Sequence, residues 1–517
     1  MPTRSGRMGL DMAIWIIVAI YFVLMLTIGV VSAKKADSLT NFVVGGRNAG
    51  PWMSAFAYGT TYFSAVIFIG YAGRSGWDFG LWAIVIGAAN ALFGAYLAWR
   101  VLAERTRDVT RRLKIKTMPQ LFEKRFFSKG MKIYAAIIIF IFMTPYSASV
   151  YSGLSYLCEK VLGIDYHIAM LGIAVVAAIY LVAGGYIASL HADLIQGIVM
   201  IFGVIAMIFF VTRSDTVGSL ANGVSKVYDN MVQGAVGSSV SQTIVGVISL
   251  VLLTSFGSWG LPQMVHKFYG IADKKSVKTG TIISTVFCTV IAVGAYFIGS
   301  LTRLYFSGVP LVNGAKNYDV MVPEILVQSL PTVLLGVVLV LVLSASVSTL
   351  SGITLTSCSA ISIDILQFSV FPKMSKKTTL LVTRLLCLVF IALSYLIASY
   401  KSPILMLMAF SWGSVAGAFL APYLLSLYWK GLNKTGAWAG MITGPLLCVT
   451  LAVLSGFNSA NSAVFGVISM AASFVACFIG SKLGSKYGKK ENAEELTAKA
   501  QFYDKEYSLQ NKSTVKA

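Results

Sequence analysis

Residues 51–73 read PWMSAFAYGTTYFSAVIFIGYAG, and this stretch decides the fold. It is long enough to cross a bilayer as one helix, because a hydrocarbon core of about 30 Å takes about 20 apolar residues. Five small or polar residues nevertheless fall in mid-span: Gly59, Thr60, Thr61, Tyr62 and Ser64. Backbone freed by a break is tolerated at membrane depth only where it lines protein or water, and its carbonyls can then bind a cation. We therefore predict a membrane helix broken near its middle.

A second segment repeats this pattern later in the chain. Residues 253–262 read LTSFGSWGLP, with Gly, Ser and Pro near the middle of another apolar run. Close helix contacts through small residues would explain either segment alone. Two such breaks at corresponding positions of two halves are typical of a transporter.

A dense run of hydroxyls lies in a third apolar segment. Residues 344–352 read SASVSTLSG between blocks of Leu and Val. Hydroxyl and carbonyl oxygens are hard donors that suit a small hard cation such as Na⁺. Bonding of these hydroxyls to their own preceding turn is the alternative.

The composition excludes a soluble chain. Of 517 residues 57% are hydrophobic and only 12% charged, with a mean hydropathy of +0.77, whereas soluble proteins carry roughly 25% charged residues. So little polar surface excludes a cytosolic enzyme, a nucleic-acid binder and a disordered scaffold. The sequence predicts an all-α integral membrane protein with about 13 transmembrane helices, at residues 12–32, 51–73, 80–103, 133–157, 166–184, 188–212, 241–262, 279–302, 325–363 (with a break near Pro331), 379–400, 403–428, 435–455 and 462–483.

The charges predict the orientation. With the N-terminus outside and the C-terminus cytoplasmic, 32 of the 41 Lys and Arg fall on the cytoplasmic side, with 12 of the 20 acids. That face is then near +20, as the positive-inside rule requires, although Arg4 and Arg7 lie outside against the trend. We interpret the net charge of +21 as a consequence of how the chain is inserted into the lipid bilayer. It does not indicate a nucleic-acid partner. The basic loop 100–132 is then a lipid-facing surface, with a regulatory or phosphoinositide role as the alternative.

No motif for catalysis is present. The six cysteines are scattered through apolar runs without a CxxC pair and are interpreted as small buried hydrophobes. The three histidines are far apart, and there is no phosphate-binding loop, His pair or serine elbow. We therefore expect a protein that is not an enzyme, with no catalytic residues and no cofactor.

One acid lies within a predicted span. Asp193 follows His191 and Ala192 near the start of the run 188–212. An acid inside the membrane is a functional-site hypothesis by default. An interfacial N-cap explains it equally well, since Asp is favourable near the start of a helix.

In order and spacing, these motifs resemble the sodium:solute symporter family, which includes bacterial sodium/proline, sodium/pantothenate, sodium/sialic acid and sodium/galactose symporters. The resemblance covers roughly residues 12–480. It is carried by VGGR at 44–47, TTYFSAVIFIG at 60–70, TMP at 117–119, FEKRF at 122–126, Gly184-Gly185, Asp193, Gln196, GLPQ at 260–263 and STLS at 348–351. It implies a multi-pass protein of the bacterial plasma membrane with a LeuT-like core of two inverted five-helix repeats, one helix before them and two after.

The resemblance also implies Na⁺ as the coupling ion. The family's ion ligands fall on the backbone carbonyls of Thr60, Phe63 and Ala345 and on the hydroxyls of Ser348 and Thr349. Members with a second Na⁺ use positions that are Asp193 and Ser351 here. Gly352 stands where such members have another Ser, so one and two ions both stay open.

For the solute, the resemblance implies positions beside the first break. Proline-type members place Ser64 and Tyr146 there, and Tyr62 replaces an acid that they carry; Trp259 is predicted as an aromatic lid. Ile67 replaces a polar sugar-binding residue, and a polyol needs many polar partners to replace water. We expect import of an amino acid such as proline, or of a carboxylate such as a monocarboxylate or pantothenate, by alternating access.

The predicted organisation has six parts: 1–50, an N-terminal tail, first helix and cytoplasmic loop; 51–212, the first repeat; 213–240, an external loop; 241–428, the second repeat; 429–484, two C-terminal helices; and 485–517, a cytoplasmic tail. Alternatives for the function are a carrier that is uncoupled or coupled to protons through Asp193, and an ion channel or a solute sensor.

Overall fold

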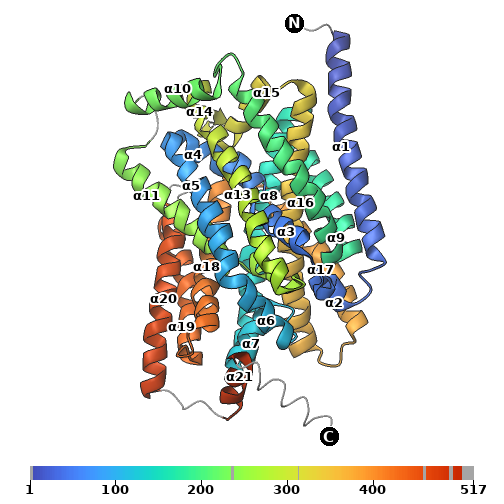
Figure 1. Cartoon of the computed structure of the whole chain (residues 1–517), viewed down its shortest axis with the longest axis vertical. Helices are drawn as coiled ribbons and strands as arrows, with labels where there is room; N and C mark the ends of the chain where they lie inside the picture. The colour runs from blue at the N-terminus through green and yellow to red at the C-terminus, as the bar shows by residue number, and fades with distance from the viewer. Residues whose placement is uncertain (1–3, 235–237, 313, 458–460, 488–492, 504–517) are drawn as a thin grey trace.

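A computed structural model describes residues 4–234, 238–312, 314–457, 461–487 and 493–503, with side chains from Met12 onward. Nearly all of this chain is helical, and most helices run along the long axis of the molecule (Figure 1). The α-helices are α1 (Arg4–Ala33), α2 (Leu39–Val44), α3 (Pro51–Tyr62), α4 (Ala72–Phe79), α5 (Ala83–Ala89), α6 (Glu104–Arg112), α7 (Met118–Phe126), α8 (Lys129–Leu162), α9 (Tyr166–Thr212), α10 (Leu220–Val232), α11 (Val240–Val251), α12 (Pro262–Lys267), α13 (Lys274–Ser300), α14 (Thr302–Tyr305), α15 (Met321–Ser329), α16 (Thr332–Ser359), α17 (Lys376–Ala398), α18 (Ile404–Tyr428), α19 (Lys434–Leu454), α20 (Ser462–Tyr487) and α21 (Ala493–Tyr503).

Shorter segments wind more tightly or more widely than an α-helix. They are η1 (Gly45–Arg47), η2 (Val66–Tyr71), η3 (Gly80–Trp82), η4 (Asn90–Leu97), η5 (Trp99–Ala103), η6 (Leu252–Phe256), η7 (Gly257–Gly260), η8 (Phe268–Gly270), η9 (Tyr318–Val320) and η10 (Ala360–Val370). The two short strands β1 (Leu311–Val312) and β2 (Ala315–Lys316) form one antiparallel hairpin, with Leu311 opposite Lys316.

Eleven helical runs in the described part of the chain are long and apolar enough to cross a membrane. The protein is therefore a multi-pass membrane protein, as its composition predicts. Two of the runs, 66–112 and 166–212, are 47 residues long and each takes in residues of two predicted crossings. The predicted boundary between helices at 166–184 and 188–212 is present as a kink within α9. Only Gly185 departs from helical geometry there, at φ 53° and ψ −144°, and a Cβ at that position would lie 2.5 Å from the Phe42 ring.

Three predicted interruptions are confirmed. Helix α3 ends at Tyr62, and the next residue, Phe63, is extended. In the second broken segment Leu261 is extended between η7 and α12, and this segment continues past the predicted end at residue 262 to Gly270. The ninth predicted run divides at Pro331 into α15 and α16.

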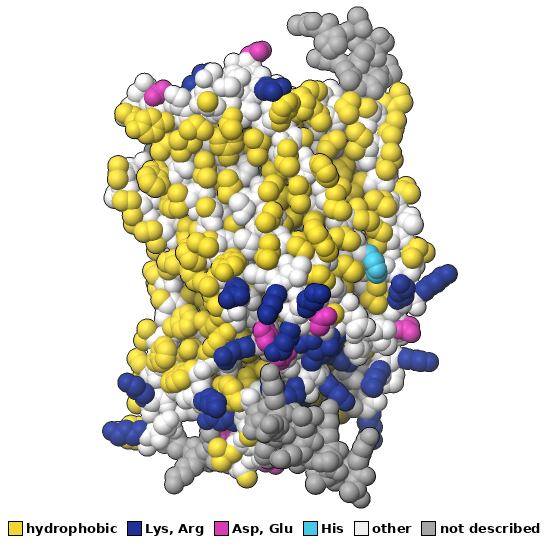
Figure 2. Space-filling view, in the orientation of Figure 1, with side chains coloured by type: hydrophobic (Ala, Val, Ile, Leu, Met, Phe, Trp, Pro, Cys, Tyr) yellow, Lys and Arg dark blue, Asp and Glu magenta, His cyan; other side chains and the backbone are white. Residues whose placement is uncertain are grey.

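The surface divides into an apolar band and one basic end. Figure 2 shows hydrophobic side chains over the middle of the molecule and most Lys and Arg gathered at the lower end, where α6, α7 and α21 lie in Figure 1. All six cysteines are buried and unpaired, as predicted. Helix α21 lies within the predicted tail, and Phe502 on it is only 1% exposed because it packs at this basic end beside Arg125.

Candidate functional site

The first break is built by local hydrogen bonds. Helix α3 starts with Pro51 at its first turn, where the missing N–H costs nothing. After Phe63 the chain restarts as η2, and the Ser64 hydroxyl accepts a hydrogen bond from the backbone N–H of Val66 at 3.2 Å. The N–H of Ala65 donates to Ser346 Oγ on α16 at 3.1 Å. Both hydroxyls thus serve the backbone amides that a helix start leaves without partners.

The hydroxyl run of α16 meets the carbonyls released by this break. Thr349 Oγ1 lies 3.3 Å from the Thr60 carbonyl oxygen, 3.1 Å from that of Thr61 and 3.0 Å from that of Ala345. Ser348 Oγ lies 2.8 Å from Thr60 Oγ1. The Thr60, Ser348 and Thr349 side chains are fully buried. Oxygen atoms from two helices nearly 300 residues apart in sequence therefore converge away from water.

Asp193 extends this oxygen cluster onto α9. Its Oδ1 accepts a hydrogen bond from Ser348 at 2.6 Å, and its Oδ2 accepts one from Ser189 at 3.2 Å. Lys267 at the end of α12 completes a buried ion pair, with Nζ 3.1 Å from Oδ2 and both side chains at most 1% exposed. Ser351 Oγ lies 3.2 Å from Ser189 Oγ. Asp193 is therefore an interior anchor between α9, α12 and α16, and the N-cap interpretation is wrong.

Two predicted positions behave differently from the cluster. Phe63 lies at the break, but within the described residues no hydrogen bond joins its carbonyl to α16. The Thr61 carbonyl, which was not predicted as a ligand, contacts Thr349 Oγ1 on α16. At Gly352 a Cβ would lie 3.2 Å from Thr61 Cγ2. The glycine therefore lets α3 and α16 approach closely at the point where a serine would add another hydroxyl.

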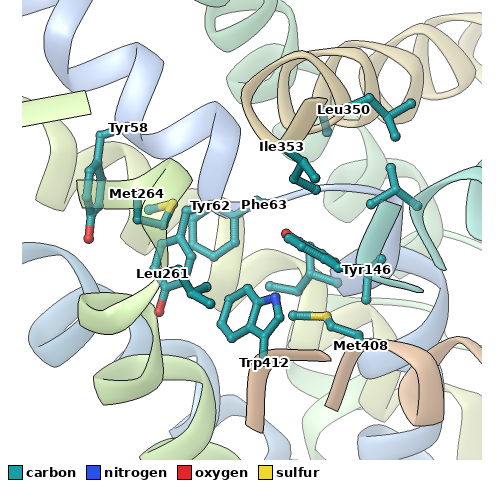
Figure 3. Packing of buried hydrophobic residues seen from close by; sticks show 14 of the residues in the cluster. Tyr58, Tyr62, Phe63, Tyr146, Leu261, Met264, Leu350, Ile353, Met408 and Trp412 are labelled. Atoms are coloured by element: carbon teal, nitrogen blue, oxygen red, sulfur yellow. The ribbon is translucent and has the colours of Figure 1, made fainter. Parts of the chain in front are cut away.

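A small cavity of about 20 Å³ adjoins the first break, close to the volume that holds one water molecule. Predicted solute residues Tyr62 and Ser64 line it, as does Ile67. Figure 3 shows Tyr62, Phe63, Tyr146, Met408 and Trp412 gathered around the same space. The Tyr146 and Trp412 rings meet edge to face at 5.6 Å.

Tyr62 joins the two breaks. Its hydroxyl donates to the Thr254 carbonyl in η6 at 2.8 Å, and Thr254 in turn donates to Asn90 Oδ1 at 2.8 Å. A Cβ at position 94 would lie 2.0 Å from the Tyr62 hydroxyl, so Gly94 makes the room for this contact. The two broken helices are thus tied to each other beside the cavity.

Trp259 lies apart from the cavity that it was predicted to cover. Its indole N–H donates to the Phe93 carbonyl at 3.0 Å, and its ring packs on Phe256 at 5.4 Å. Trp412 provides the aromatic wall instead; it is 1% exposed, and its Nε1 has no hydrogen-bond partner in the described structure.

Four residues of the site were not predicted from the sequence. The four are Lys267, Trp412, Asn90 and Thr254. Lys267 had a usable signal, because it is a cation only five residues after Pro262 in an apolar segment; the charge count assigned it to the cytoplasmic surface. Thr254 lies within the second broken segment, where it was given no role, and Asn90 and Trp412 stand in ordinary apolar runs that only the fold brings to the break.

Comparison with known proteins adds three relatives. Residues 42–444 match the model of the sodium:solute symporter family. The chain is 29% identical over 476 residues to sodium/proline symporter 2 of Staphylococcus saprophyticus, covering 89% of this chain and 90% of that protein. It is 30% identical over 442 residues to the osmoregulated proline transporter OpuE of Bacillus subtilis (84% and 88% covered). It is also 30% identical over 476 residues to the sodium/proline symporter of Haemophilus influenzae (88% and 90% covered).

A solved structure shares the fold. The substrate-bound, outward-open state of a Na⁺-coupled sialic acid symporter matches with a TM-score of 0.75 and 20% identity, over 91% of this chain and 98% of that one. At that identity the likeness concerns the fold alone.

The buried ion pair gives a stability prediction. Replacing Lys267 by Met leaves the Asp193 carboxylate buried without its counter-charge, which typically costs about 3–5 kcal/mol. We expect K267M to lower the thermal unfolding midpoint of the purified protein markedly, and the double variant D193N/K267M to recover much of the loss. A double variant that loses the sum of the two single losses would show that the pair is not coupled.

Proposed function

The chain belongs to the sodium:solute symporter family and couples the import of a small organic solute to Na⁺; from this premise we propose that the solute is proline. The relatives named for proline align over about nine-tenths of their own length. The lining of the cavity is largely aromatic, which suits a compact apolar ring better than a polyol; at about 20 Å³ the cavity is closed, and it would have to widen to admit the solute. Ser64 stands at the start of the η2–α4 half-helix, where the positive end of the helix dipole favours a carboxylate.

We propose that Na⁺ binds between α3 and α16. Its ligands would be the carbonyls of Thr60, Phe63 and Ala345 and the hydroxyls of Ser348 and Thr349. The single observation that carries this proposal is the position of Thr349 Oγ1, which lies 3.3 Å from the Thr60 carbonyl oxygen and 3.0 Å from that of Ala345. Na⁺ bound there would interact favourably with the negative ends of these carbonyl and hydroxyl dipoles. Because the break that ends α3 also borders the solute cavity, through Tyr62 and Phe63, ion and solute binding would strengthen each other reciprocally.

We propose that Asp193 and Ser351 organise this ligand set and do not hold a second Na⁺. The Asp193 carboxylate already receives Lys267, Ser348 and Ser189. A second ion would have to displace the ammonium group, and Gly352 offers no hydroxyl to compensate. One Na⁺ per solute is the stoichiometry that this arrangement supports.

We also propose thirteen crossings, with the N-terminus outside and the C-terminus cytoplasmic. A 47-residue helix is about 70 Å long, more than twice a hydrocarbon core of about 30 Å. The run 166–212 would therefore cross twice, with Gly185 as the turning point in α9, and the run 66–112 would complete the broken crossing that α3 begins and then make one more after Gly80. The core would be the repeats 51–212 and 241–428, each opening with a broken helix. The basic end in Figure 2 would face the cytoplasm.

Cysteine labelling checks this orientation. Lys316 on β2 and Lys373 after η10 are exposed at opposite predicted sides, and the six native cysteines are buried. A membrane-impermeant maleimide should label K316C in intact cells and K373C only after permeabilisation. The reverse pattern would overturn the proposed orientation.

Uptake measurements test the ion site. In proteoliposomes, labelled proline should accumulate with external Na⁺ and not with choline, with a Hill coefficient for Na⁺ of about 1. T349V keeps the shape of the side chain but removes an ion ligand, so the Na⁺ concentration for half-maximal uptake should rise by roughly tenfold or more, equivalent to about 1.4 kcal/mol.

T356V is the matched control for that variant. It lies on the same helix, and the Thr356 hydroxyl has no partner in the described structure, so its Na⁺ dependence should stay near that of wild type. Equal shifts in the two variants would reject the site, and undiminished uptake in choline would reject Na⁺ coupling.

Two tryptophans test the solute cavity. W412A removes an aromatic wall worth about 1–2 kcal/mol, so the KM for proline should rise roughly tenfold, while W412F should keep most of the affinity. W259A removes a side chain outside the cavity and should leave the KM within about twofold. A larger effect from W259A than from W412A would restore the lid that the sequence predicts.

A further inference from the structure

A cavity of about 790 Å³ opens on the side of the molecule between α10, α11 and the turn that leads into α5. Most of its lining is apolar. Six of the lining side chains are also exposed: Trp82, Val85, Tyr228, Val232, Ile244 and Ile248. Figure 2 shows hydrophobic side chains over the region of α10 and α11, continuous with the apolar band of the molecule. The cavity therefore opens toward the bilayer, because its walls belong to the lipid-facing surface.

Helix α10 forms one wall of the cavity and has the pattern of a helix that lies in a membrane interface. Figure 1 shows it across the end of the molecule opposite the basic end, at a steep angle to the long helices. Its residues Leu220, Val224, Tyr228 and Val232 are four apart in sequence, so they share one broad face, and all four are exposed. The opposite face carries Lys226. An amphipathic helix of this kind places its apolar face among lipid chains.

The inner face of α10 is held by contacts that keep it apart from α11. The Met231 sulfur accepts the backbone N–H of Leu81 at 3.2 Å. Arg303 on α14 donates to the carbonyl of Asp78 at 3.1 Å, and its Nη1 lies 3.4 Å from Asn230 Oδ1 on α10. Because these contacts fix α10 to η3 and α14, its apolar face borders an open cavity and does not pack on α11.

We propose that this cavity binds one acyl chain of a phospholipid from the leaflet opposite the basic end. Water would find few hydrogen-bond partners in an apolar cavity, and such cavities take up apolar ligands instead. A hydrocarbon chain makes the close contacts with the lining that an empty space forfeits. The bilayer supplies such chains at the mouth of the cavity. The inference does not depend on which solute the protein carries.

The chain would lie against the first half of the second broken helix. Ile244, Val247 and Ile248 on α11 line the cavity, and α11 continues directly into η6. The η6 segment carries the Thr254 carbonyl that accepts the Tyr62 hydroxyl. A bound chain therefore braces the helix that leads from the outer interface to the second break.

Native mass spectrometry of the purified full chain tests the proposal. Protein stripped of lipid in a short-chain detergent is titrated with dioleoyl phosphatidylglycerol. Wild type should bind one lipid distinctly more tightly than any further one. I244W places an indole in the cavity and should weaken this first binding step at least tenfold.

L385W is the matched control for I244W. Leu385 on α17 is 53% exposed, close to the 54% of Ile244, and it lies outside the cavity, so L385W should bind the lipid like wild type. An equal loss in the two variants would overturn the proposal. A wild type without a preferred first lipid, or a dimer of the chain that excludes the lipid, would also overturn it.

Photo-crosslinking keeps the proposal testable if I244W does not fold. A phosphatidylglycerol that carries a diazirine in its acyl chain is added to wild type at one molecule per protein. Peptides from α10 and α11 should be labelled, and those from α17 should not. Labelling of α17 to the same extent would overturn the proposal.

Discussion

Everything in this fold depends on the interrupted backbone of α3 and on what satisfies it. A helix that stops at Tyr62 leaves carbonyls at membrane depth, where water cannot reach them and an unsatisfied group is costly. One partner comes from α16, since the single hydroxyl hydrogen of Thr349 lies within reach of the carbonyls of Thr60 and Thr61. Gly352 allows the close approach of the two helices. The same interaction thus holds the core together and gathers oxygens for a cation.

The contacts around this junction explain how an ion can govern a solute. Ser348 links the junction to Asp193, and Lys267 neutralises that acid from α12, just beyond the second break. On the other side, the Tyr62 hydroxyl binds the η6 segment of the same broken helix. A change in the α3–α16 contact must therefore be felt at both breaks and at the cavity between them. These direct contacts are sufficient to couple ion binding to solute binding.

Much of the architecture could be predicted from the sequence, because apolar length and polar interruption are local properties. The breaks at residues 63, 261 and 331 follow from runs of Gly, Ser and Pro within apolar segments, and Thr60, Ser348 and Thr349 stood out because so few polar groups lie in the spans. The family resemblance placed Thr60 beside Ser348 and Thr349, as the structure does, but the other contacts between distant residues could not be predicted. Nothing in the sequence pairs Lys267 with Asp193. Nothing in it distinguishes Trp259, which contacts Phe93, from Trp412, which lines the cavity.

A crystal structure of the protein grown with NaCl and proline tests the central claim most directly. The account predicts an ion bound by the carbonyl oxygens of Thr60, Phe63 and Ala345 and by the Ser348 and Thr349 hydroxyls, with proline against Trp412. In that state the Thr349 hydroxyl hydrogen points away from the carbonyls, because its oxygen faces the ion. An ion bound elsewhere, with Thr349 Oγ1 still donating to the α3 carbonyls, would contradict the account.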